Sequence, residues 1–274
     1  MGFIERLGKG WHIVLQSFRV VQADKELLVY PILQGLIILG IGALILIPAI
    51  FSGLGTGQNP GLIFAMFLFI AISYFVSAFF QATIVSSASI RFSGKNPTLG
   101  DGFKKPLGRA FALFTWAIVT FFVSLLISAL RGNRRSGGFG RAAVAGAAEL
   151  GWSLITFYVI PVILFEKLSV FKAIGRSSSL FKKTWGEHVT ARFTIHTLIG
   201  LILVPFLLLL FWAIYAQSVS FIVFSGVLFF IALLVVCVLQ AVTDGILRAA
   251  LYEYAVKGKV PKVYSSDTLR GLFE

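Results

Sequence analysis

The sequence predicts an all-α fold: a polytopic transmembrane helix bundle of about six spans, with short amphipathic helices on the cytoplasmic side. Hydrophobic residues make up 58% of the 274 residues, above the roughly 45–50% of a soluble globular domain, and the mean hydropathy is +0.92. These residues form blocks about as long as the ~20 residues that a helix needs to cross a bilayer. The connections between the blocks are short, so we expect a single membrane domain over residues 1–274.

Residues 1–29 predict an amphipathic N-terminal helix, because apolar side chains recur there at spacings of three and four. Such a helix either lies in the headgroup region with Trp11 at the interface or packs on the cytoplasmic ends of the spans. The first apolar run begins near Leu27 and has the length of a full span, with no small-residue cleavage pattern after it. It is therefore not interpreted as a signal peptide.

Apolar runs predict the spans. The second and the sixth run exceed the length that a bilayer requires, so we expect them to tilt or to project into the cytoplasm. Prolines 31, 161 and 205 lie in or beside spans, where neighbouring helices satisfy the backbone groups that proline leaves unbonded. Residues 251–274 are expected to form a cytoplasmic tail. The predicted spans are 30–51, 62–90, 109–130, 142–165, 193–216 and 220–250.

The positions of lysine and arginine predict the orientation, because basic connections stay in the cytoplasm. With both termini inside, most of the 24 basic residues fall on the cytoplasmic side. The exception is the third connection, which carries Arg131, Arg134, Arg135 and Arg141 on the outer side. We expect a multi-pass protein of the cytoplasmic membrane.

The net charge of +13 indicates membrane lipids as partners. In a soluble protein such a charge would suggest nucleic acid, but here the charges flank apolar blocks, so anionic headgroups are the better match. After Glu166 a basic helix is expected from about Ser169 to Lys182, with its apolar side in the interface and Trp185 at headgroup depth. Alternatively, these charges only fix the orientation. The residues expected to contact lipid or a partner are Lys172, Arg176, Lys182, Lys183 and Trp185.

Polar side chains inside spans are candidates for function, because burying them in lipid is costly. Asp244 and Arg248 are four residues apart and share a helix face. We interpret them as a structural pair in preference to a proton or ion relay. Glu149 is expected near an arginine of the third connection. Three amides could line a path across the membrane: Gln34, Gln81 and Gln240.

Catalytic and metal-binding motifs are missing from the sequence, which contains no nucleophile elbow, zincin motif or phosphate-binding loop. The serine cluster 177–179 is interpreted as a solvated loop, and Cys237 as a small core residue. The histidines at positions 12, 188 and 196 lack metal-ligand spacing. We therefore predict no enzymatic activity, no cofactor and no metal.

Small residues suggest close helix packing. Ala143, Ala147 and Gly151 form a stripe on the fourth span, and Gly35 with Gly42 could do the same on the first. Packing within the chain is the default expectation; a homo-oligomer or a membrane-protein partner is the alternative. A Gly-Lys-x-Pro turn follows both the second and the sixth span, at 94–97 and 258–261. This leaves a duplicated helical hairpin as a hypothesis.

Several short motifs together resemble one family. The sequence is similar to an uncharacterised group of small polytopic membrane proteins that carries a domain-of-unknown-function label, and more distantly to the membrane domain of some glycerophosphodiester phosphodiesterases. The resemblance implies six helices in a prokaryotic cytoplasmic membrane and no transferable catalytic residues. The motifs are Asp24-Lys25-Glu26-Leu27 before Pro31, the 94–97 turn, Pro161 with Glu166, Ala173-Ile174-Gly175-Arg176-Ser177, and Tyr252-Glu253-Tyr254-Ala255 before Gly258.

Two functions follow from these observations. The first is a non-enzymatic multi-pass membrane protein whose basic cytoplasmic face binds anionic lipid or a protein partner. The second is a small-solute transporter or channel, which would need polar groups or broken helices at the membrane midplane. A water-filled cavity lined by the three glutamines would favour the second function, and a filled core would favour the first.

Overall fold

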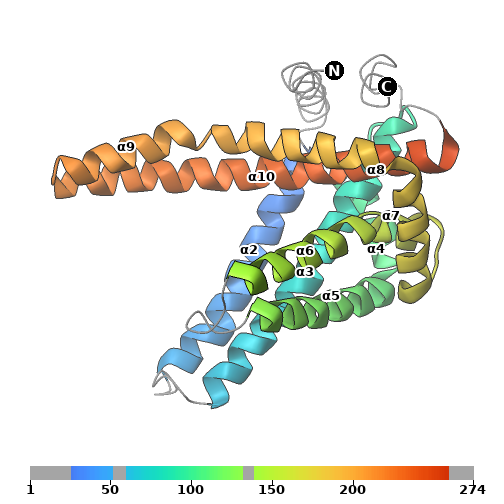
Figure 1. The fold of residues 1–274 in the computed structure, drawn as a ribbon, viewed down its shortest axis with the longest axis horizontal. Coiled ribbons are helices and arrows are strands. Elements are labelled where there is room, and N and C mark those ends of the chain that lie inside the picture. The colour runs from blue at the N-terminus through green and yellow to red at the C-terminus, as the bar shows by residue number, and fades with distance from the viewer. Residues whose placement is uncertain (1–25, 52–59, 132–138, 259–274) are drawn as a thin grey trace.

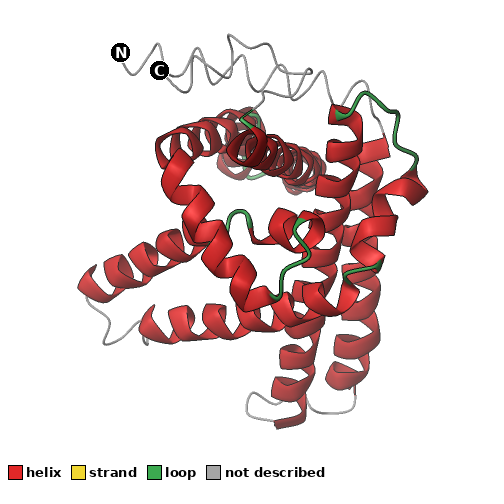
Figure 2. Cartoon of the chain, turned by 90° about the vertical axis from the view of Figure 1, so that its right-hand side faces the viewer, coloured by secondary structure: helices red, strands yellow, loops and turns green. Residues whose placement is uncertain are grey.

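The computed structural model describes residues 26–51, 60–131 and 139–258, and every regular element in these ranges is a helix (Figure 2), which confirms the all-α prediction. The side chains of residues 139, 183–196, 198 and 257 are not described. The predicted N-terminal helix falls largely on residues 1–25, outside the described ranges. The helices are α2 (Glu26–Ala49), α3 (Pro60–Phe92), α4 (Leu99–Leu107), α5 (Ala110–Arg131), α6 (Phe139–Ile155), α7 (Val159–Phe165), α8 (Val170–Leu201), α9 (Val204–Tyr215) and α10 (Val219–Lys257).

Five helical segments are long and apolar enough to cross a membrane by length and composition. They are α2, α3, α5, the segment Gly140–Phe165 formed by α6 and α7, and Val219–Val256 of α10. The expected span over 193–216 corresponds to the end of α8 and to α9, where the apolar helix Ile199–Tyr215 is shorter. The count of six spans therefore stays a prediction.

The helix ends fall into two groups at opposite ends of the molecule (Figure 1). The ends that face the connections α2–α3, α5–α6 and α9–α10 lie toward the left of the view. Helix α4, the α7–α8 connection and the end of α10 lie toward the right. This alternation is what a chain that crosses a membrane repeatedly requires.

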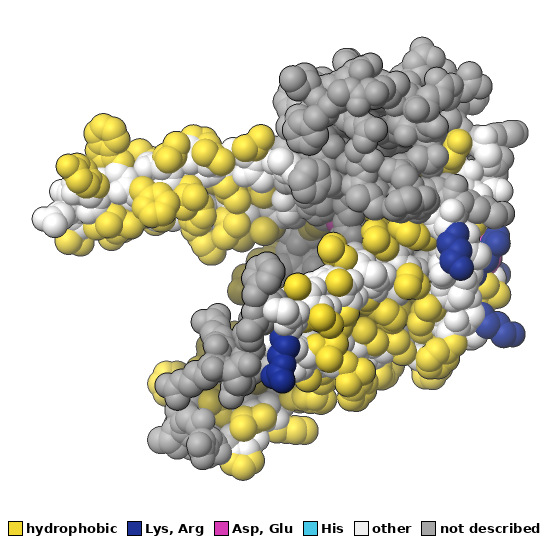
Figure 3. All heavy atoms as spheres, in the orientation of Figure 1, with side chains coloured by type: hydrophobic (Ala, Val, Ile, Leu, Met, Phe, Trp, Pro, Cys, Tyr) yellow, Lys and Arg dark blue, Asp and Glu magenta, His cyan; other side chains and the backbone are white. Residues whose placement is uncertain are grey.

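The core lies where α3, α7 and α10 meet. Its largest fully buried side chains include Tyr30, Ile84, Tyr158 and Ile246. The far parts of α2, α3, α9 and α10 instead expose large apolar side chains, and Figure 3 shows them covering the projecting hairpin of α9 and α10. Contiguous apolar surface of this extent is rare on soluble proteins, so it indicates a membrane protein. Cys237 belongs to this exposed surface, so its expected place in the core is wrong.

Three glycines of the described chain permit close helix contacts, and one of them belongs to an expected stripe. A Cβ atom at Gly42 of α2 would lie 3.1 Å from the Phe69 ring of α3, whereas one at Gly35 would meet no atom within 4 Å. A Cβ atom at Gly245 of α10 would lie 2.3 Å from Ile84 of α3, and one at Gly102 of α4 would lie 2.2 Å from the Tyr30 hydroxyl. Ala143 and Ala147 are exposed, and Gly151 has no neighbour that a Cβ would meet. The expected stripe on α6 therefore does not pack against another part of the described chain.

The ends of α3 and α10 resemble each other. Each of these long helices is followed by a glycine in the left-handed region, Gly94 at φ 85° and Gly258 at φ 65°, as is common at helix C-termini. The Ser89 hydroxyl donates to the Glu253 carboxylate over 3.1 Å, and this bond joins residues 164 positions apart, the offset that also separates Gly94 from Gly258. The duplicated hairpin stays a hypothesis.

Candidate functional sites

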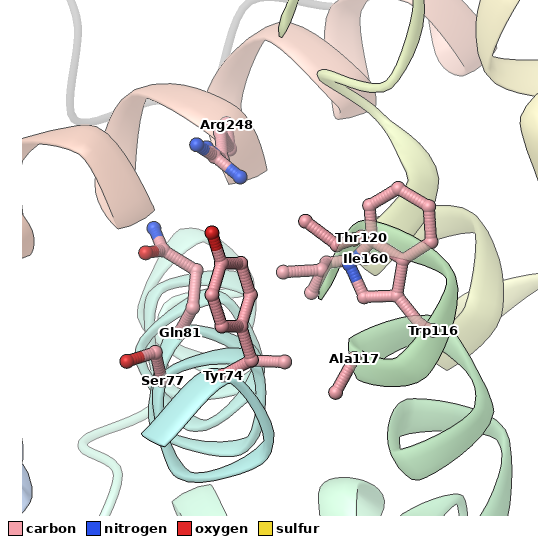
Figure 4. Close-up of a pocket in the computed structure, with 9 residues that line it drawn as sticks. Tyr74, Ser77, Gln81, Trp116, Ala117, Thr120, Ile160 and Arg248 are labelled. Atoms are coloured by element: carbon pink, nitrogen blue, oxygen red, sulfur yellow. The ribbon is translucent and has the colours of Figure 1, made fainter. Parts of the chain in front are cut away.

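A small, open pocket lies between the four helices α3, α5, α7 and α10. Its volume is about 160 Å³. We call it the polar pocket, because side chains that can donate hydrogen bonds face it from three helices (Figure 4). Its lining residues are Tyr74, Ser77, Ala78 and Gln81 of α3, Trp116, Ala117 and Thr120 of α5, Ile160 of α7 and Arg248 of α10.

Helical periodicity brings the polar residues of the pocket together. Tyr74, Ser77 and Gln81 are three and four positions apart on α3, so they share one face. In Figure 4 the Tyr74 hydroxyl and the Gln81 amide point toward the space below the Arg248 guanidinium. The pocket is therefore built where α10 crosses α3, close to the tight contact at Gly245.

Some polar side-chain atoms of α3 and α5 at the pocket have no hydrogen-bond partner among the described residues. They are Nε2 of Gln81 and Oγ1 of Thr120, and both atoms are buried. A buried polar group left unsatisfied costs about 1–3 kcal/mol, so such atoms usually meet water or a ligand. Ser77 differs, because its hydroxyl accepts a hydrogen bond from Gln34 of α2 over 3.3 Å.

The polar pocket lies deep within the apolar part of the chain. Helix α5 has 22 residues, which at about 1.5 Å per residue spans the ~30 Å hydrocarbon layer. Thr120 stands halfway along α5, and Ser77 stands near the middle of α3. If α5 crosses a bilayer, the pocket is near its midplane.

Exposed lysines gather at the other candidate site, which we call the basic end. Figure 3 shows Lys and Arg side chains at the right-hand end of the molecule, beside α4 and the start of α8. Large apolar side chains are exposed among these lysines, with Leu107 at 62% and Phe171 at 74%. The exposed lysines of the basic end are Lys95, Lys104, Lys105, Lys167, Lys172 and Lys182.

The predicted basic helix begins as expected and ends differently. Ser169 is the N-cap of α8, but α8 continues to Leu201, so the predicted end at Lys182 is wrong. Continued helical hydrogen bonding carries the chain onward, and α8 turns from the end of the bundle to run beside α10 (Figure 1). Lys172 and Lys182 are exposed. The side chains of Lys183 and Trp185 lie outside the described part.

Arg176 has a partner within the protein. Its Nε–H donates to both carboxylate oxygens of Glu166, over 3.1 and 3.0 Å, and the Tyr252 hydroxyl donates to the same carboxylate over 3.2 Å. Arg109 donates to the carbonyl oxygens of Ile163 and Leu168 nearby. These contacts join α5, α7, α8 and α10. The contact that Arg176 makes in the structure is therefore one that stabilises the basic end.

Ser177 corrects the interpretation of the serine cluster as a solvated loop. It lies inside α8 and is fully buried. Its hydroxyl donates to the Ile155 carbonyl oxygen over 2.6 Å and accepts from the Tyr158 amide over 3.0 Å. The hydroxyl thereby satisfies backbone groups at the break between α6 and α7, which explains why a polar residue is buried here.

The expected intramembrane polar residues separate into different places. Gln81 and Arg248 meet in the polar pocket, and Gln34 contacts the lining residue Ser77. Gln240 is half-buried on α10 and does not line this pocket. Glu149 accepts from Arg131 at the α5–α6 end, the kind of contact expected from the sequence. The pairing of Asp244 with Arg248 stays a prediction.

Four pocket residues that carry polar side-chain groups were not anticipated from the sequence: Tyr74, Ser77, Trp116 and Thr120. The spacing of Tyr74 and Ser77 before Gln81 was an available signal, since it places three polar side chains on one face of an apolar helix. The spacing of residues within one helix does not show which other helices it meets, so the contribution of α5 and α10 to the pocket could not be predicted.

One family profile matches the chain. It is described as a family of unknown function, DUF6159, and it matches residues 61–262. The matched range contains all the residues of the polar pocket and the described lysines of the basic end. No curated protein matches the chain in sequence. The distant resemblance to the membrane domain of glycerophosphodiester phosphodiesterases stays a prediction.

Proposed function

The chain belongs to the DUF6159 family of unknown function, and we propose that it is a non-enzymatic multi-pass protein of a prokaryotic cytoplasmic membrane. In this proposal both termini are cytoplasmic and the basic end binds the headgroups of anionic lipids. A protein partner with an acidic surface would use the same lysines, and the experiment below separates the two ligands.

The observation that carries the proposal is the mixture of exposed lysines and exposed apolar side chains at the basic end. Leu107 follows Lys105 on α4, and Phe171 precedes Lys172 on α8; all four residues are exposed. Apolar side chains in this arrangement insert at the acyl boundary while the ammonium groups reach the phosphates. Each lysine near an anionic leaflet contributes on the order of 1 kcal/mol.

The test compares lipid selectivity in wild type and in the triple variant Lys95→Gln, Lys172→Gln, Lys182→Gln. These lysines are exposed, so their removal should leave the fold intact. Three charges at about 1 kcal/mol each predict a loss of at least tenfold in the preference for phosphatidylglycerol over phosphatidylcholine. Mass spectrometry of the protein released from mixed nanodiscs measures the lipids that stay bound.

A matched control removes three arginines of the third connection, Arg134→Gln, Arg135→Gln and Arg141→Gln. This control should retain phosphatidylglycerol as wild type does. Unchanged retention by the lysine variant, with its orientation preserved, contradicts lipid binding. Loss of a co-purified acidic protein without loss of lipid would assign the lysines to a protein partner.

The polar pocket favours a second candidate, a small-solute transporter or channel. It contains Gln81, one of the amides expected along a path, and if α5 crosses a bilayer the pocket is at the depth where transporters hold their substrates. Cysteines placed at Ser77 and Thr120, in a Cys237→Ser background, test this with a small membrane-impermeant thiol reagent. A path predicts modification from both sides of the membrane, and no modification from either side excludes it.

A further inference from the structure

We propose that the polar pocket binds a compact anionic group, a carboxylate or a phosphate. This inference does not rest on lipid binding at the basic end, because the two sites share no residue.

Several of the side chains that line the pocket carry hydrogen-bond donors. Arg248 supplies a guanidinium, Gln81 a buried Nε2 with no protein partner, and Thr120 a buried hydroxyl with no protein partner. Tyr74 adds a further hydroxyl. No carboxylate belongs to the lining. A group with several acceptor oxygens and a negative charge matches this set.

The surroundings strengthen an interaction with a charged ligand. The remaining walls are apolar and come from Ala78, Ala117, Ile160 and the Trp116 ring. Hydrogen bonds and ion pairs are stronger in such a medium than in water. The Arg248 guanidinium carbon lies 5.2 Å from the centre of the Phe157 ring, and this cation–π contact helps to orient the guanidinium before a ligand arrives.

The volume indicates the size of the group that the pocket can surround. At about 160 Å³ the pocket is comparable to engineered cavities of ~150 Å³ that accept benzene. Roughly six non-hydrogen atoms therefore fit, as in butyrate, and inorganic phosphate also fits. A complete phospholipid headgroup with its glycerol exceeds this volume, so a lipid could place only its acidic end in the pocket.

The experiment measures thermal unfolding of the protein in neutral phosphatidylcholine nanodiscs as sodium butyrate or sodium phosphate is added. A ligand that binds only the folded state raises the melting temperature in a saturable way. We expect butyrate, phosphate or both to do so. Butyramide, which has nearly the same shape without the charge, and sodium chloride at equal concentration should not.

Substitutions in the lining assign the effect to the pocket. Gln81→Leu and Thr120→Val should each raise the half-saturating concentration at least tenfold, and Arg248→Gln should abolish the response. Ser124→Ala is the matched control, since Ser124 lies one turn beyond Thr120 on α5 and outside the lining. If Arg248→Gln does not fold, the Gln81 and Thr120 variants still decide the question.

Two results overturn the proposal: neither anion exceeds sodium chloride, or the Gln81 and Thr120 variants respond as wild type does. Nanodiscs that contain phosphatidic acid identify the source of the anionic group. Competition between phosphatidic acid and the soluble anion supports the proposal with a lipid as the ligand. Binding of the soluble anion without competition supports it with a free acid or phosphate.

Discussion

Arg176 shares its Nε–H between the two carboxylate oxygens of Glu166, at 3.1 and 3.0 Å, across the turn from α7 into α8. Tyr252 of α10 donates to the same carboxylate and stacks on Phe165, with ring centroids 5.4 Å apart. These residues belong to three of the motifs by which the sequence resembles its family. Their contacts join the ends of α7, α8 and α10, so we interpret these motifs as structural.

Replacing Glu166 by Gln should destabilise the protein by roughly 1–3 kcal/mol, because hydrogen bonds to a charged group are lost and Arg176 is left without its counter-charge. Tyr252→Phe removes a single bond and should cost less, about 0.5–1.5 kcal/mol. Denaturant unfolding in detergent measures both changes. Equal stability of wild type and Glu166→Gln would show that the ion pair contributes nothing.

Gly245→Ala should destabilise the contact of α10 with α3. The new methyl group would meet Ile84 at 2.3 Å, and overpacking of this kind costs about 1–3 kcal/mol. Gly226→Ala on the same helix is the control, because no atom lies within 4 Å of a Cβ there; it should be neutral or slightly stabilising. Thermal unfolding compares the two variants, and similar melting temperatures would contradict the close contact.

Asp101 should hold the first turn of α4 across a wide pH range. The Lys104 ammonium and the Thr98 hydroxyl both donate to its carboxylate at 2.7 Å, which holds the pKa of Asp101 well below its ordinary value of 3.8. Because the pKa is lower in the folded state, the charged carboxylate stabilises α4 above pH 3.8, and this contribution is lost only as the pH falls through the lowered pKa.

Amide hydrogen exchange of α4 between pH 7 and pH 4 tests this prediction. Wild-type protection factors should stay constant over the range, whereas Asp101→Asn should lower them at every pH, because the capping box with Thr98 is broken. Protection that falls in wild type as the pH drops from 7 to 4 would contradict the lowered pKa.

The all-α class and most of the long apolar helices were predictable, because the length of an apolar run and the position of a proline can be read directly from the local sequence. The start of α8 at Ser169 and Val170 was anticipated from its amphipathic spacing. Its end was not, because the polar face of residues 172–183 suggested a short surface helix, whereas the helix continues along α10. The close contacts at Gly102 and Gly245 depend on which helices cross, and spacing along one helix does not contain that information.

The polar pocket was predictable only in part. Gln81 and Arg248 were candidates as polar residues in apolar runs, but they lie on α3 and α10, which are far apart along the chain and meet only in the folded protein. Arg176 was expected to face lipid because its charge matches that of Lys172. Its contact with Glu166 depends on the tight turn between α7 and α8, where Lys167 has a φ of 54°.

The orientation of the basic end tests the whole account most directly. Single cysteines at Ser179 and Ser218, both exposed, are labelled in intact cells with a membrane-impermeant reagent in a Cys237→Ser background. We predict labelling of Ser218→Cys from outside and of Ser179→Cys only after the membrane is opened. Two further cysteines, at Ser136 and Ser265, fall outside the described residues. With six spans, Ser136→Cys should be labelled from outside like Ser218→Cys, and Ser265→Cys only after the membrane is opened, like Ser179→Cys. Labelling of Ser179→Cys from outside would place the basic end away from the anionic cytoplasmic leaflet and contradict the account.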